Sequence, residues 1–69
     1  MQLLDVVVVV RDLPDLNLHQ GQVGTIVEVY APNIFEVEFV DLQGKTYAIA
    51  TLDANQVMQL HYQALPQIA

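Results

Sequence analysis

The hydrophobic positions of this chain follow patterns that are typical of β-strands. Residues 6–10 are five consecutive valines, a length and composition that favour a strand covered on both faces over a helix. The most regular pattern is residues 21–30, in which Gly21 and Gly24 open a run of alternating residues. We expect one glycine to supply a positive φ and the other to permit a bulge or a close backbone approach. This run is therefore predicted to be the central strand, paired on both sides.

A second alternating run covers residues 34–40 and predicts a strand that is half buried in an antiparallel sheet. One face carries Phe35, Val37 and Phe39, and the other carries Glu36 and Glu38. We expect the apolar face to point into the core and the glutamates to point to solvent. Together with residues 21–30, this strand should form a hairpin.

The remaining elements are short. Residues 41–44 should form a tight turn with Gly44 at a positive φ, before a strand over residues 46–50 that has Tyr47 and Ile49 on one face. Residues 53–56 begin with the capping residue Asp53 and should form one helical turn that leads into a last strand. Residues 12–20 contain breakers and three leucines, which indicate a long loop held against the sheet, with a short helical turn around Asp15 as an alternative.

The predicted fold is all-β: a small five-stranded SH3-like barrel with a long loop after the first strand and a short helical turn before the last one. Residues 1–60 should be a single domain, because a chain of 69 residues allows only one. Residues 61–69 contain Pro66 and little periodicity, so we expect a flexible C-terminal tail.

Composition limits how such a small domain is stabilised. A short chain buries a small fraction of its surface, and the absence of cysteine rules out disulfides as compensation. The apolar fraction is 54%, against 14% charged residues. Part of that apolar surface could therefore face another subunit, and a homodimer is one expectation.

The net charge of the chain limits the classes of partner that it can bind. Eight acidic residues against Arg11 and Lys45 give a net charge of −6, which repels polyanions. We therefore expect no binding to nucleic acid or to a membrane. The chain shows no basic leader and no apolar run long enough to span a bilayer, so a cytoplasmic location is the expectation.

The candidate chemical groups do not indicate an enzyme. Serine and cysteine are both absent, and no activating base lies near Lys45 or the threonines in the sequence. His19, His61 and Asp15 could bind a metal, but their spacing does not support a site, and we expect no metal and no cofactor. Gly21 and Gly24 precede a strand and not the helix that a phosphate loop requires. An aromatic groove of the kind with which SH3 domains bind proline-rich peptides remains an alternative role for the tyrosines Tyr30, Tyr47 and Tyr62.

The acidic residues are distributed unevenly along the chain. Four carboxylates lie on or beside the predicted hairpin with no basic residue between them: Glu28, Glu36, Glu38 and Asp41. Like charges on neighbouring strands cost stability. These four residues are therefore either tolerated for solubility or form the binding site for a basic partner protein.

Several motifs together resemble a known family. They are Asp5–Val10, Asp12–Pro14, Gly21–Tyr30, Phe35–Asp41, Gly44–Thr46 and Thr51–Leu52. In this combination the chain resembles an uncharacterised bacterial family, frequent in cyanobacteria, that is catalogued as a domain of unknown function (DUF4926). The resemblance covers roughly residues 3–60 and implies an SH3-like fold in a bacterial cytoplasm, but no site residues. A looser similarity to KOW-type barrels, through Gly21 and Gly24, lacks the basic residues with which those modules bind RNA.

We therefore expect a non-enzymatic protein–protein interaction module. It would be a small subunit of a larger complex, or an acidic antitoxin-like or immunity-like partner of a basic protein. The alternative is a structural homodimer, and a small metal-binding protein or enzyme is the least supported class.

Overall fold

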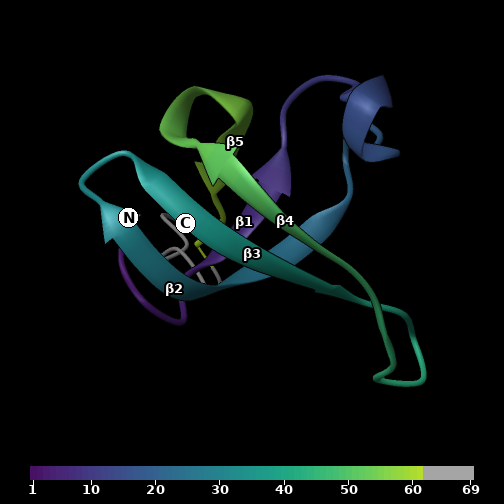
Figure 1. Cartoon of the computed structure of the whole chain (residues 1–69). Helices are drawn as coiled ribbons and strands as arrows, with labels where there is room; N and C mark the ends of the chain where they lie inside the picture. Colours follow the sequence, from purple (N-terminus) through teal and green to yellow (C-terminus); the bar gives the residue numbers. More distant parts are fainter. Residues whose placement is uncertain (62–69) are drawn as a thin grey trace, which may run out of the picture.

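The computed structural model describes residues 1–61, which form one antiparallel sheet of five strands (Figure 1). The strands are β1 (Val6–Val9), β2 (Val23–Ala31), β3 (Ile34–Val40), β4 (Thr46–Asp53) and β5 (Val57–Gln59). Two 3₁₀ turns, η1 (Pro14–Leu16) and η2 (Ala54–Gln56), lie in the connections. The order across the sheet is β4-β3-β2-β1-β5. The all-β class, the five strands and the central position of β2 are thus confirmed. The tail predicted over residues 61–69 lies, apart from His61, outside the described residues.

The sheet is open, and the prediction of a closed barrel is wrong for residues 1–61. A barrel requires a ladder between the two end strands. Here β4 and β5 are the ends of the strand order and do not pair with each other. β5 begins one 3₁₀ turn after β4 and pairs with β1 over only three residues, so it offers little backbone for closure. The outer edge of β4 consequently has no strand partner in the described part of the chain.

The two glycines before and within β2 have the two predicted roles. Gly21 has a φ of 95°, a left-handed conformation that favours glycine. Gly24 is buried, and a Cβ atom there would lie 2.6 Å from Val37 Cγ1 and 2.9 Å from the carbonyl oxygen of Glu38. The absence of a side chain at Gly24 therefore lets β2 and β3 pack closely at the middle of the sheet.

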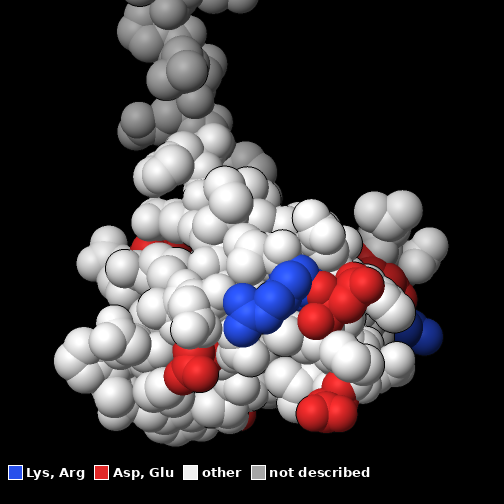
Figure 2. All heavy atoms as spheres, turned by 90° about the horizontal axis from the view of Figure 1, so that it is seen from above, with Lys and Arg blue, Asp and Glu red and all other residues white. Residues whose placement is uncertain are grey.

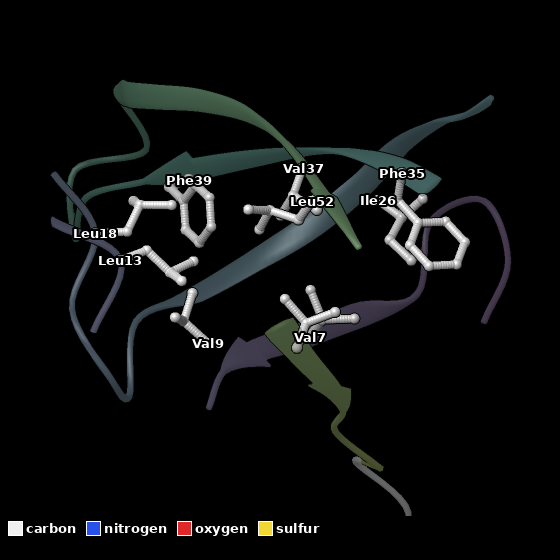
Figure 3. Close-up of a cluster of buried hydrophobic side chains, with 10 residues drawn as sticks. Val7, Val9, Leu13, Leu18, Ile26, Phe35, Val37, Phe39 and Leu52 are labelled. Atoms are coloured by element: carbon white, nitrogen blue, oxygen red, sulfur yellow. The ribbon is translucent and has the colours of Figure 1, made fainter. Parts of the chain in front are cut away.

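One face of the sheet carries the hydrophobic core (Figure 3). In Figure 3, Phe39 and Leu18 lie at one end of the core and Phe35 with Ile26 at the other. Phe35, Val37 and Phe39 are all buried, which confirms the predicted inward face of β3. The ten buried residues are Val7, Val9, Leu13, Leu18, Ile26, Phe35, Val37, Phe39, Leu52 and Val57. Burial of side chains of this size contributes about 1.5 to 3 kcal/mol each before the entropy cost of folding.

The valine run forms a strand that is buried on one face only. Val7 and Val9 belong to the core, whereas Val6 and Val8 are only partly buried. One face of this strand is buried as predicted, whereas the other face is only partly buried. The outer faces of β1 and β2 stay partly exposed to solvent.

The loop after β1 is held by two leucines. Leu13 and Leu18 are buried and form an isolated antiparallel bridge around η1, while Leu16 is exposed. Asn17 ends the 3₁₀ turn in a left-handed conformation with a φ of 55°. The short helical turn around Asp15, kept as an alternative in the sequence, is thus present.

The hairpin of β3 and β4 extends away from the rest of the sheet at its turn (Figure 1). Gly44 has a φ of 82° in this turn, as predicted. β4 runs to Asp53 and is longer than the predicted 46–50. A register shift after Phe39 places Tyr47 where its ring centroid is 6.2 Å from that of Phe39, on the core side. The expectation that Tyr47 shares a face with Ile49 is therefore wrong, because a bulge can place consecutive side chains on the same side.

The turn before β5 is a capping box. Asp53 and Gln56 cap η2 reciprocally, and the Asp53 backbone N–H donates to Gln56 Oε1 at 2.8 Å. This satisfies groups at the start of the turn that would otherwise lack partners. The predicted helical turn and the last strand are both confirmed.

Candidate functional site

The outer face of the β2–β3 hairpin brings three glutamates together. Glu28 is the register partner of Glu36 on the neighbouring strand, and Glu38 follows Glu36 on the same face of β3. Directly opposite side chains have Cβ atoms about 4.5 to 5.5 Å apart. Glu28 is exposed, while Glu36 and Glu38 are partly exposed and not buried. We call these three residues the acidic face.

Tyr30, which the sequence offered only as part of an aromatic groove, lies beside the acidic face. Its hydroxyl donates a hydrogen bond to Glu36 Oε2 at 3.0 Å. This bond raises the pKa of Tyr30 above its ordinary value, and desolvation and the charges of Glu36 and Glu28 raise it further. The side chain is 57% exposed, so its hydroxyl is available to a partner at the margin of the acidic face.

The fourth predicted carboxylate, Asp41, has a structural role. Its Oδ1 accepts hydrogen bonds from the backbone N–H groups of Gln43 and Lys45, both at 2.9 Å. This arrangement is an Asx-type turn that closes the β3–β4 hairpin. Asp41 therefore serves the turn, and it is not a register neighbour of Glu28 or Glu36.

Other aspartates also serve the backbone. Asp5 Oδ2 accepts from the N–H of Gln2, and Asp12 Oδ1 accepts from the N–H of Gln20, each at 2.9 Å. Asp53 belongs to the capping box. The three glutamates thus differ from these aspartates, because a turn or cap explains each aspartate and explains none of the glutamates.

Neither of the two basic residues belongs to β2 or β3. Arg11 Nη1 donates to the carbonyl oxygen of Asn55 in η2 at 2.9 Å. Lys45 lies in the turn between β3 and β4. In Figure 2, acidic side chains appear as separate spots on a mostly uncharged surface, and the basic side chains in view lie beside some of them. The glutamates of the acidic face therefore have no lysine or arginine on the same two strands.

The metal alternative gains no support from the geometry. Within residues 1–61, no three His, Cys, Asp or Glu side chains gather as a metal site would require. His19 Nδ1 and Nε2 are not brought to Asp15 and His61 in such a group. The structure thus leaves these three residues as separate surface positions.

The tyrosines do not form one groove in the described residues. Tyr30 contacts Glu36 near the start of β3, whereas Tyr47 packs against Phe39 near its end and accepts a hydrogen bond from Gln22 Nε2 at 3.3 Å. Tyr62 lies outside the described part. The SH3-type aromatic groove is therefore not assembled from Tyr30 and Tyr47.

Two shallow hollows lie elsewhere on the surface. One is lined by Asn33, Asp53, Ala54 and Asn55. The other is lined by residues of the β1–β2 loop and of η2: Asp12, Leu13, Pro14, Asp15, Leu16 and Gln56. The acidic face lines neither of these two hollows.

No helix in the described residues is long and apolar enough to cross a membrane.

Comparison with known proteins gives one positive result. No curated protein and no solved structure gives a match to the chain. The family model described as Domain of unknown function (DUF4926) matches residues 3–59, which cover the whole sheet from before β1 to the end of β5. The chain therefore belongs to the DUF4926 family.

Proposed function

We propose that this protein is a non-enzymatic interaction module that binds a basic protein through the acidic face. The observation that carries the proposal is the register pair of Glu28 and Glu36, two like charges directly opposite each other on adjacent strands. Such a pair destabilises a sheet by about 0.2 to 1 kcal/mol. A small domain has little stability to lose, so this arrangement favours a role that needs both charges.

The surroundings of the pair support the same interpretation. Tyr30 donates to Glu36, which holds that carboxylate in place without neutralising it. Tyr is also frequent at the centre of protein interfaces, where its ring packs and its hydroxyl bonds. An acidic patch beside an exposed tyrosine fits lysine and arginine side chains on a partner, which can pair with the carboxylates and stack on the ring.

The partner would be either the rest of a larger complex or a basic protein that this chain neutralises, as antitoxins and immunity proteins do. We also retain the SH3-like topology as part of the proposal. It is supported by five antiparallel strands, a long loop after the first strand and a 3₁₀ turn before the last. The competing interpretation is that the glutamates only keep the chain soluble.

The test is affinity capture from native extract with the immobilised protein and two variants. Glu36→Gln/Glu38→Gln removes two charges from the acidic face and keeps side-chain size. Asp5→Asn/Asp15→Asn removes the same charge elsewhere and keeps an acceptor oxygen at Asp5. A partner that binds the native protein and the control pair, but not the Gln pair, would support the proposal.

Kinetics with the captured partner then give a second measurement. Because charges at the rim of an interface act mainly by steering, association should be fastest at low ionic strength and slow markedly by about 0.5 M salt. The melting temperature of the Gln pair should not fall. If the Gln pair binds as well as the native protein, or if binding is insensitive to salt, the acidic face is only a solubility device.

A further inference from the structure

The outer edge of β4 presents backbone hydrogen-bonding groups that no strand of the described chain uses. In an antiparallel ladder, alternate residues direct both N–H and C=O toward the neighbouring strand. The N–H of Ala54 donates to Asn33, and the register then assigns the even-numbered residues of β4 to β3. Ile49 and Thr51 consequently direct their N–H and C=O groups away from β3, toward the edge.

Beyond the bulge at Tyr47, over residues 48–53, this edge lacks the usual features that prevent strand pairing. Edge strands are commonly short, or they carry lysine, proline or inward-pointing charges. β4 is eight residues long, and its only charged or proline residue is Asp53 at its end. Ile49 is 56% exposed in the middle of the strand. The edge of β4 can therefore form backbone hydrogen bonds with another strand.

We propose that a second copy of this chain pairs with this edge, antiparallel and centred on Ile49. The two-fold arrangement is favoured by the opposite charges that flank the strand, Lys45 before β4 and Asp53 at its end. Antiparallel pairing about Ile49 brings the end of β4 that follows Lys45 in each copy close to the Asp53 end of the other copy. The isoleucines then become cross-strand neighbours, and both lose exposed apolar surface.

The acidic charge does not prevent this pairing. Glu38 is the register partner of Ile49, so the two Glu38 residues of a dimer would be three strand spacings apart, about 14 Å. This separation exceeds the Debye length of about 8 Å at physiological ionic strength. Glu28 and Glu36 stay exposed, because edge pairing occurs in the plane of the sheet. The dimer would therefore carry two acidic faces, and this inference does not depend on the proposed partner.

The first test is the mass of the purified protein over a dilution series, by sedimentation or light scattering. We expect a monomer–dimer equilibrium. Thr51→Pro removes an outward N–H without breaking the β3–β4 ladder, since proline is tolerated at a strand edge. Two hydrogen bonds are lost per dimer, so dimerisation should weaken about tenfold or more. Thr51→Ala keeps the N–H and should dimerise within about threefold of the native protein.

The second test does not depend on how Thr51→Pro folds. The native chain has no cysteine, so a single introduced thiol forms a disulfide only between two copies. Cα atoms of a hydrogen-bonded antiparallel pair are about 5.5 Å apart, within the range of disulfides. With oxidised glutathione as oxidant, Ile49→Cys should cross-link about tenfold faster or more than Leu42→Cys, a fully exposed control in the β3–β4 turn.

Two results would overturn the proposal. One is a monomer at every concentration, with Ile49→Cys cross-linking no faster than Leu42→Cys. The other is a dimer whose dissociation constant is the same for a folded Thr51→Pro variant and for Thr51→Ala, which would place the interface elsewhere. Failure of either kind leaves the binding of a basic partner by the acidic face untouched, because the capture experiment measures that binding separately.

Discussion

The two halves of β2 differ in their strand partners and in their burial. Residues 23–26 bond to both β1 and β3, and Gly24 and Ile26 are buried. Beyond the register shift at residues 26–28, the described ladder continues with β3 alone, and Glu28, Val29 and Tyr30 are exposed. One continuous strand therefore supplies the centre of the fold with its first half and the candidate binding surface with its second.

The register shifts explain this division. The β2–β3 ladder is irregular between residues 26 and 28 and again between residues 29 and 31. Bulges bend a strand and increase its local twist, and both irregularities lie at or beyond the point where the burial of β2 changes. The difference predicts that substitutions in the first half change stability, while those in the second half change the surface.

The largest expected effect compares Ile26→Ala with Val29→Ala. Ile26 has no exposed surface, so its truncation leaves a cavity and should cost about 2 to 5 kcal/mol of unfolding free energy. Val29 is 39% exposed, and its truncation should cost about 0.5 kcal/mol. Urea denaturation measures both. Equal losses would show that the end of the hairpin is as much part of the core as the centre of β2.

Gly24→Val tests the close packing of the first half directly. The new Cβ would meet Val37 Cγ1, the Glu38 carbonyl and Phe39 Cδ1 at 2.6 to 2.9 Å, and backbone atoms cannot easily move away. We expect a loss of about 1 to 3 kcal/mol by thermal or urea denaturation. Thr25→Val is the control. Thr25 is the next residue of β2, its side chain lies on the outer face of the sheet, and threonine and valine are both β-branched. An unchanged melting temperature for Gly24→Val would contradict the close approach of β2 and β3.

The sequence predicted the features that depend on local chemistry. Alternation gave the inward face of β3, and the turn residues Gly21 and Gly44 have the positive φ values expected of them. The cap at Asp53 likewise marked the 3₁₀ turn before β5. These features depend on side-chain periodicity and backbone sterics within a few residues. They can therefore be predicted from the sequence without knowledge of the fold.

Features set by long-range pairing could not be predicted in this way. Whether β4 and β5 close a barrel depends on the length of β5 and the twist of the whole sheet, and neither has a local signal. The bulge after Phe39 that turns Tyr47 toward the core shifts the pattern by one position with no change in residue type.

The arrangement of the candidate residues could be predicted only in part for the same reason. Glu36 and Glu38 share a face by simple alternation, but the pairing of Glu28 with Glu36 follows from the hairpin register. The two-residue turn at residues 32–33 does not by itself predict this register, because the register also depends on both irregularities in β2. The same irregularities bring Tyr30 to Glu36, so no sequence pattern marked that hydrogen bond.

A smaller effect, of opposite sign, is expected for Glu28→Gln. Removing one charge of the Glu28–Glu36 pair relieves cross-strand repulsion and should raise the unfolding free energy by about 0.2 to 0.5 kcal/mol. Asp15→Asn makes the same change in net charge at an exposed position of η1, so the difference between the two variants isolates the pair. A Glu28→Gln protein that is less stable than Asp15→Asn would mean that Glu28 contributes to the fold, and the argument for recognition would lose its basis.

The smallest expected effect is the titration of Tyr30. The hydrogen bond to Glu36 is the main cause that raises the pKa of Tyr30 above its ordinary value of 10.0, followed by desolvation and by the charges of Glu36 and Glu28. The folded protein thus holds this proton more tightly than the unfolded chain. The stability linked to Tyr30 is therefore fully present below about pH 10 and is lost as the pH rises through the raised pKa.

Ring-carbon NMR of tyrosine follows this titration directly. In Glu36→Gln, the pKa of Tyr30 should return toward its ordinary value, because the charged acceptor has been removed. Glu38→Gln removes the same charge from the same strand without touching the hydrogen bond, and it should lower the pKa less. If the two variants shift the pKa of Tyr30 equally, the general negative field of the hairpin and not the hydrogen bond sets the titration, and Tyr30 then has no specific place in the acidic site.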